Sequence, residues 1–297
     1  MAKLVLGTDI NNTGTASFIR DVSPKYYVEK TVDANGKLVG SNVIINLSGA
    51  TDVGDYVLEH SYYMVTFPAN TTLDFSSLIT LSGERAFYYM FSNSSNLTHV
   101  DLSSLQVISG TYASYYMFNN CSTIISFDLS SLQTISGTQG CQSTFYDCTG
   151  LTNANLSSLI TISGSNGCKQ MFLGCTNLVN VDLSSLQTIS GSSACSSMFS
   201  GCISLKNVVF DSLTTISGSS ACSQMFYNCT SLISISFPSL KSNSVTATNA
   251  FNTMLRGVIG CTLHFPSNLE STIQTLTGYP NFGGTNTSIV FDLSATE

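Results

Sequence analysis

The sequence predicts an α/β solenoid, a right-handed coil in which every rung carries short parallel strands and a short helical turn. The first observation behind this prediction is an unbroken period of 27 residues, since Gly83 recurs at Gly110 and Phe91 recurs at Phe118. The second is that alternating apolar residues are followed, within each period, by an i, i+3, i+4, i+7 apolar pattern. A fixed period of this length indicates one supersecondary unit per repeat, stacked so that neighbouring units bury a shared core.

One copy of the repeat, residues 178–204, predicts where each side chain points. In the run LVNVDLSSLQTIS, apolar residues alternate with polar ones, which is typical of short strands and directs Asp182 outward. Gly191 then turns the chain. The remaining apolar residues predict one face of a short helix that packs into the core and holds no cofactor: Cys195, Met198, Phe199 and Cys202.

Non-repeating segments flank the series, so we expect three parts. Residues 1–68 read as a β domain that caps or anchors the solenoid, residues 69–265 form the solenoid, and residues 266–297 form a C-terminal cap of one helix and one strand.

The repeat pattern also resembles a known family. Residues Cys175 to Cys202 follow C-x-x-L-x-x-V-D-L-S-S-L-x-T-I-S-G...M-F-x-x-C, which is similar to the BspA-type leucine-rich repeats of bacterial surface and adhesion proteins. In that family M-F-x-x-C or A-F-x-x-C closes each unit, whereas the usual repeat is shorter and often has Pro after the first strand. The resemblance implies a leucine-rich repeat coil, display on a surface, and adhesion to a host protein or glycan.

Composition excludes several classes of partner. Charged residues make up 9% of the chain, against about 25% in ordinary globular proteins. The net charge is -7 and the ten Lys and Arg residues are not clustered, which argues against binding to nucleic acid or to anionic membranes. No apolar run reaches the ~18 residues of a membrane span, so we expect no membrane insertion. The first residues do not form a secretory signal as written.

The ten cysteines fall into repeat registers, which favours free, buried thiols over disulfides. Cys195 and Cys202 are seven residues apart, about 10 Å on a helix, and disulfides need Cα atoms within about 7 Å. Cross-repeat disulfides are the alternative. Zinc is not expected, because no C-x-x-C is present and no histidine follows a cysteine register. The two rows are Cys141, Cys168, Cys195, Cys222 and Cys121, Cys148, Cys175, Cys202, Cys229, with Cys261 apart.

The most regular polar feature is a row of outward Asp residues beside rows of Ser. We interpret each Asp as the acceptor of an Asx turn that fixes the bend between strands. The alternative is a calcium ladder, because carboxylates about 5 Å apart can hold a divalent cation; Asn155 interrupts such a ladder. The row contains Asp74, Asp101, Asp128, Asn155 and Asp182, and the ladder would use Asp101, Asp128 and Asp182.

No catalytic set, cofactor loop or further metal site is predicted. The three histidines are scattered, and the Gly-Ser-Ser runs lack the glycine spacing and Lys of a phosphate loop. The sequence therefore predicts a protein that is not an enzyme.

Tyrosines break the repeat consensus in the first rungs, where later copies have Ser or Gln. Exposed tyrosines suit protein interfaces and sugar stacking, although packing of the N-terminal domain on these rungs is an alternative. The residues predicted to bind partners are Tyr88, Tyr89, Tyr112, Tyr115 and Tyr116. We expect a non-enzymatic structural or recognition protein on a surface. It is favoured as a bacteriophage virion component, attached to a larger assembly through its N-terminal domain; the alternative is a bacterial cell-surface adhesin.

Overall fold

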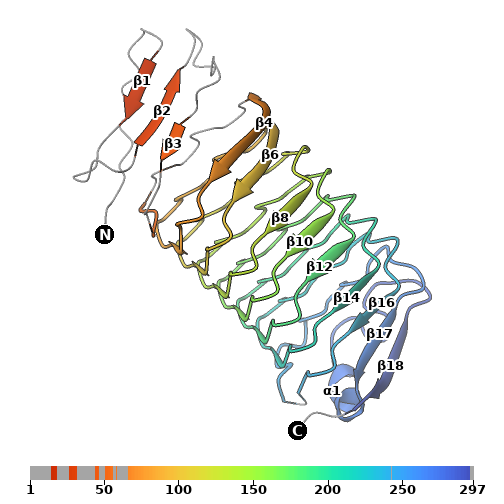
Figure 1. Cartoon of the computed structure of the whole chain (residues 1–297). Helices are drawn as coiled ribbons and strands as arrows, with labels where there is room; N and C mark the ends of the chain where they lie inside the picture. The colour runs from red at the N-terminus through yellow and green to blue at the C-terminus, as the bar shows by residue number, and fades with distance from the viewer. Residues whose placement is uncertain are drawn as a thin grey trace.

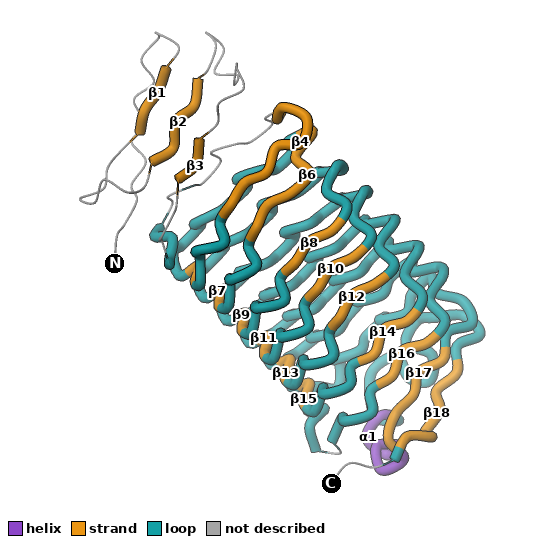
Figure 2. Tube along the Cα trace, viewed as in Figure 1, coloured by secondary structure: helices purple, strands orange, loops and turns teal. Residues whose placement is uncertain are grey.

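A computed structural model describes residues 15–18, 27–31, 44–46, 51–55, 58, 66–241 and 243–294. From Thr66 onward the chain winds into coils that stack along one axis, with strands aligned on two sides of the stack (Figures 1 and 2). Strands of successive coils pair in parallel and in constant register. The predicted solenoid of short parallel strands is thereby confirmed, and it contains few helices.

The first side of the coil carries one strand per coil, in consecutive sheets of two, three and four strands. In the central sheet Asn153 pairs with Asn180 and Ala154 with Val181, so residues 27 apart lie directly beside each other. In three-residue strands such as β8 and β10, the middle residue points into the core and its two neighbours point outward. The strands are β4 (Thr66–Asp74), β6 (Ser95–Asp101), β8 (Ser126–Asp128), β10 (Asn153–Asn155), β12 (Asn180–Asp182), β14 (Asn207–Val209), β16 (Ser234–Ser236), β17 (Thr262–Pro266) and β18 (Ser288–Leu293).

The second side is one six-stranded parallel sheet of two-residue strands. Its inward positions are β-branched or Leu, for example Ile162 beside Ile189, whereas the preceding Thr is half-buried. The strands are β5 (Thr80–Leu81), β7 (Val107–Ile108), β9 (Thr134–Ile135), β11 (Thr161–Ile162), β13 (Thr188–Ile189) and β15 (Thr215–Ile216).

The third side differs from the helical turn that the apolar pattern predicts. It consists of consecutive tight turns in which Ser193, Ser197 and Gly201 take positive φ angles of 51°, 54° and 76°. A turn that repeats every four residues buries the same i, i+3, i+4, i+7 set as a helix does over two turns, so the sequence pattern fits both. The turns prevail because their N–H groups reach the next coil, as in the 2.9 Å bond from Phe199 N to Met225 O.

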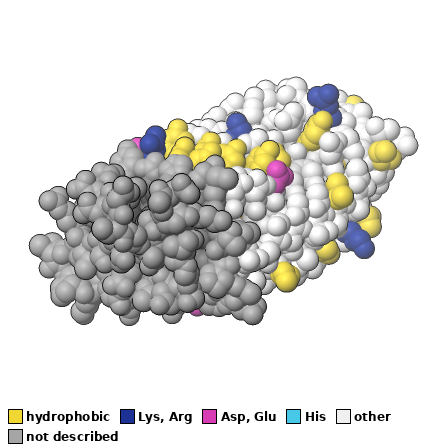
Figure 3. All heavy atoms as spheres, turned by 90° about the horizontal axis from the view of Figure 1, so that it is seen from above, with side chains coloured by type: hydrophobic (Ala, Val, Ile, Leu, Met, Phe, Trp, Pro, Cys, Tyr) yellow, Lys and Arg dark blue, Asp and Glu magenta, His cyan; other side chains and the backbone are white. Residues whose placement is uncertain are grey.

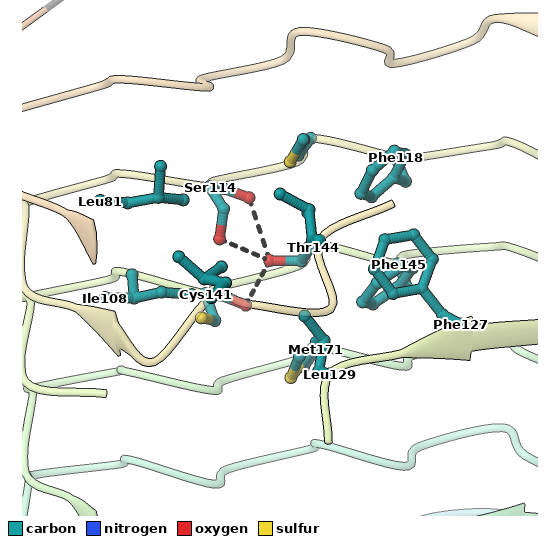
Figure 4. Close-up of a pocket in the computed structure, with 13 residues that line it drawn as sticks. Leu81, Ile108, Ser114, Phe118, Phe127, Leu129, Cys141, Thr144, Phe145 and Met171 are labelled. Atoms are coloured by element: carbon teal, nitrogen blue, oxygen red, sulfur yellow. Dashed lines mark hydrogen bonds between the residues drawn. The ribbon is translucent and has the colours of Figure 1, made fainter. Parts of the chain in front are cut away.

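Inside the coil, side chains from all three sides form one continuous core. Five phenylalanine pairs of the turn side stack ring on ring, for example Phe145 on Phe172 at 5.4 Å and Phe172 on Phe199 at 5.6 Å. One coil departs from the pattern, because Thr144 occupies the register of a Met. Its hydroxyl lies 3.2 Å from that of Ser114, beside a cavity of about 10 Å³ (Figure 4).

The two ends of the described chain are not built from the repeat. Strands β1 (Thr15–Phe18), β2 (Tyr27–Thr31) and β3 (Ile44–Asn46) form an antiparallel sheet in the predicted N-terminal β domain, most of which lies outside the described residues. At the other end a 3-10 turn, Ser267–Leu269, leads into the short helix α1 (Glu270–Ile273), and β18 pairs with β17. Leu269, Ile273 and Leu276 are buried.

Candidate partner-binding surface

The tyrosines predicted to bind partners all lie on the turn side of two successive coils. Tyr88 and Tyr115 share one register, and Tyr89 and Tyr116 share another. The structure brings all five together, with each ring within 6.1 Å of at least one other. We call Tyr88, Tyr89, Tyr112, Tyr115 and Tyr116 the tyrosine cluster.

The constant register of the coils stacks these rings into two columns. Tyr88 lies on Tyr115 at 5.1 Å and 8°, and Tyr89 lies on Tyr116 at 5.0 Å and 11°. Edge contacts join the columns, since the ring centres of Tyr115 and Tyr116 are 4.6 Å apart and their planes meet at 67°. Such ring pairs contribute about 0.5–1.5 kcal/mol each beyond their burial, so the coils hold the cluster in one arrangement.

Two residues outside the prediction belong to the same surface. The guanidinium carbon of Arg85 lies 5.2 Å from the centre of the Tyr88 ring and 5.8 Å from that of Tyr112. The ring of Tyr146, from the next coil, contacts that of Tyr116 at 5.6 Å and 39°, although Tyr146 lies in a different register. Arg85 shares the register of Tyr112, which is the signal that could have identified it in the sequence.

Packing within the cluster changes the acidity of its central ring. Burial, followed by the neighbouring Tyr116, Tyr88 and Tyr112, raises the pKa of Tyr115 to about 12. Its hydroxyl therefore stays protonated at neutral pH and is available as a hydrogen-bond donor and acceptor. A half-buried aromatic surface with polar tips is the composition typical of protein interfaces.

The Asp row has the geometry of Asx turns. Asp101 Oδ1 accepts from Ser103 N at 2.9 Å, and Asp182 Oδ1 accepts from Ser184 N at 3.0 Å. Asn155 makes the same bond to Ser157 N, at 3.1 Å. Within the described part of the chain, no group of three or more His, Cys, Asp or Glu side chains is placed to hold a metal ion.

All ten cysteines are free and buried, as predicted. In the second row each thiol donates to a phenylalanine carbonyl of the preceding coil, for example Cys175 Sγ to Phe145 O at 3.0 Å. Burial raises the pKa of Cys222 and Cys229 to about 12. The cysteines of the second row thus link neighbouring coils through hydrogen bonds, and thiols with raised pKa values are poor nucleophiles at neutral pH.

A family model described as the BspA type leucine-rich repeat region matches the chain in six copies, over residues 70–193 and 142–274. The chain belongs to this family. The crystal structure of the T. pallidum leucine-rich repeat protein TpLRR is similar to it, with 22% sequence identity over 56% of this chain and 72% of that one, and a TM-score of 0.33. No curated protein sequence matches the chain.

The family assignment covers the coils that carry the tyrosine cluster. BspA-type repeats are typical of surface-associated proteins and of repeat-based protein interaction, and the family is typically non-catalytic. None of the described helices is long and apolar enough to cross a membrane. The face drawn in Figure 3 carries few charged side chains.

Proposed function

We propose that this BspA-type repeat domain is a non-enzymatic recognition module displayed on an exterior surface, and that its tyrosine cluster binds a protein partner. The observation that carries this proposal is the confinement of two stacked tyrosine columns to the first coils. At the register of Tyr89 and Tyr116 the following coils have Ser143, Gln170 and Ser197, which form the same turn. Because the coil folds without tyrosine there, the rings are not needed for its backbone.

The remaining coils differ from the first ones in composition, which supports different roles for different coils along the axis. Residues 151–231 are nearly uniform and poor in the large aromatic and Arg side chains that anchor interfaces. We infer that these coils act as a spacer, while residues 1–68 attach the domain to a larger assembly. Stacking between nearest neighbours allows a spacer to change in length without a change in its ends.

The test replaces the tyrosines with residues that the chain itself uses. Tyr115→Gln and Tyr116→Ser introduce the residues of the next coil, Gln142 and Ser143, at the same register. We expect the double variant to fold normally and to bind cells or virions of the source at least tenfold more weakly, as measured by co-sedimentation of the labelled full chain. Tyr227→Ser, which introduces the residue of Ser200 in a distal coil, is the control.

Unchanged binding by the double variant would overturn the role of the cluster. An equal loss of binding by the Tyr227→Ser control would show that the assay had measured the stability of the coils.

The domain could be carried by either of two kinds of particle, a bacteriophage virion or a bacterial cell. Ten buried, unpaired thiols suit a protein that folds in a reducing compartment, as virion proteins do, and favour a bacteriophage virion component. The family supports a bacterial adhesin, and immunogold labelling of virions and of intact cells distinguishes the two.

A further inference from the structure

A second surface, on the first side of the coil, is an open hollow lined by polar side chains. A hollow of about 400 Å³ lies across β6, β8, β10 and β12, within the range of about 300–1,000 Å³ typical of small-ligand pockets. His99 stands at one end. Two outward rows line the rest, Ser126, Asn153, Asn180 and Asp128, Asn155, Asp182.

Hydrogen bonds within these rows leave a defined set of groups for a ligand. One oxygen of Asp128, Asn155 and Asp182 accepts the backbone N–H two residues further along the chain. The second oxygen of each Asp has no hydrogen bond with any described residue, and neither has the Asn155 Nδ2 group. Because Asn155 Oδ1 is the acceptor in its turn, Nδ2 is the outward donor. The row therefore offers acceptor, donor and acceptor, at intervals of one strand.

The neighbouring row is arranged by its own amides. Asn180 Nδ2 donates to Asn153 Oδ1 at 2.9 Å, and Asn153 Nδ2 donates to Thr152 Oγ1 at 2.9 Å. Asn180 Oδ1 is left as an outward acceptor, since it has no hydrogen bond within the described chain. Fixed amide orientations reduce the ordering cost of binding.

Charge and spacing select the ligand. No Lys or Arg lines the hollow, and Asp128 and Asp182 are acidic, so anionic ligands are disfavoured. These two carboxylates are two strands apart, about 10 Å, which is too far for both to ligate one Ca²⁺ at about 2.4 Å. A neutral ligand whose groups both donate and accept fits better. A sugar hydroxyl donates to a carboxylate and accepts from an amide N–H at the same time.

We propose that this hollow binds a linear, neutral, β-linked glycan that lies along the solenoid axis. Strands follow one another at about 4.8 Å, and an extended β-linked chain advances by a similar length per sugar unit. Each sugar then meets one coil, with Asn155 donating to a hydroxyl that Asp128 or Asp182 accepts from. The site lies on a different side of the coil from the tyrosine cluster and does not depend on it.

The test uses isothermal titration of the full chain with three neutral, extended, β-1,4-linked pentasaccharides (cellopentaose, penta-N-acetylchitopentaose and mannopentaose), and with the α-linked, curved maltopentaose for comparison. We expect at least one β-linked pentasaccharide to bind with a millimolar or lower Kd, and maltopentaose to bind at least tenfold more weakly. Asn155→Asp should weaken the bound pentasaccharide about tenfold or more, because it replaces the donor with a third carboxylate. The variant carries the residue of Asp128 and Asp182 at the same register, so its turn is preserved.

Gln133→Glu, at an exposed position preceding β9 on the second side, makes the same change in charge and should leave binding unchanged. The proposal is overturned if none of the three β-linked pentasaccharides binds, or if Asn155→Asp and Gln133→Glu have equal effects. Binding of an uncharged extended peptide such as (Gly-Ser)₄ in preference to every pentasaccharide would also overturn it. Full glycan binding by the tyrosine variants would show that the two surfaces act separately.

Discussion

The glycines of one register stack closely on the preceding coil, which gives a prediction about stability. Another glycine of the same repeat supplies the control variant. A Cβ placed on Gly164 would lie 2.1 Å from the carbonyl oxygen of Gly137 in the preceding coil, whereas ordinary contacts begin at 3.4 Å. The two coils would have to separate by 1.3 Å at this point (3.4 − 2.1). That movement would also break the bond from Gly164 N to Ile135 O, which is already 3.3 Å long.

We therefore expect Gly164→Ala to lower the free energy of unfolding by about 2–4 kcal/mol, the sum of overpacking and one lost hydrogen bond. Gly167→Ala is the matched control, because Ala194 occupies its register in the next coil. Its nearest contact would be 3.0 Å, to Gly164 O, and we expect a change between zero and a gain of about 1 kcal/mol from the stiffer unfolded chain. Urea unfolding followed by circular dichroism measures both; equal stabilities of the two variants would refute the stacking argument.

Four further predictions concern the polar and thiol rows. Cys175→Ala removes the donor to Phe145 O and should cost about 1–3 kcal/mol, whereas Cys175→Ser, which introduces the residue of Ser94 at this register, should cost less in the same urea assay. Alkylation should label few native thiols but nearly all ten after denaturation. Burial raises thiol pKa values from about 9 to about 12, so stability should fall as pH rises through that window, where only the unfolded state ionises; a flat pH profile would contradict this. Asp182→Ala should cost about 0.5–2 kcal/mol and Asp182→Asn little, and a rise in Tm on adding calcium would favour the ladder instead.

The sequence was sufficient to predict the solenoid, because the 27-residue period and the positions of the buried residues can both be read without knowing the backbone conformation that connects them. Every 27th residue must meet its copy, so the rows of Phe, Gly and Cys follow from counting alone. The backbone of the turn side could not be predicted in the same way. Four-residue turns and a helix bury the same positions over eight residues, and the choice depends on hydrogen bonds between coils, as between Phe199 and Met225.

Both candidate surfaces lie where the repeat changes, but they differ in how visible they are in sequence. Tyr115 and Tyr116 are conspicuous because large aromatic rings replace the Gln and Ser of the next coil. The hollow depends on a smaller change, the single Asn155 within a row of Asp. Asn155 can replace Asp in an Asx turn, so the turn alone accounts for Asn155 in the sequence. Its second role becomes visible only once the direction of its side-chain Nδ2 group is known.

The structure adds the direction of the second polar group of each residue in the row of Asp128, Asn155 and Asp182. In an Asx turn the backbone N–H takes one side-chain oxygen, so Asp presents an acceptor outward and Asn presents a donor. A row of Asp alone would repel itself and attract cations, whereas one Asn between two Asp residues gives neighbouring groups of opposite hydrogen-bonding character. The same residue that weakens a calcium ladder therefore suits a hydroxyl-rich ligand, and Asn155→Asp changes the expected ligand of the row without changing its turn.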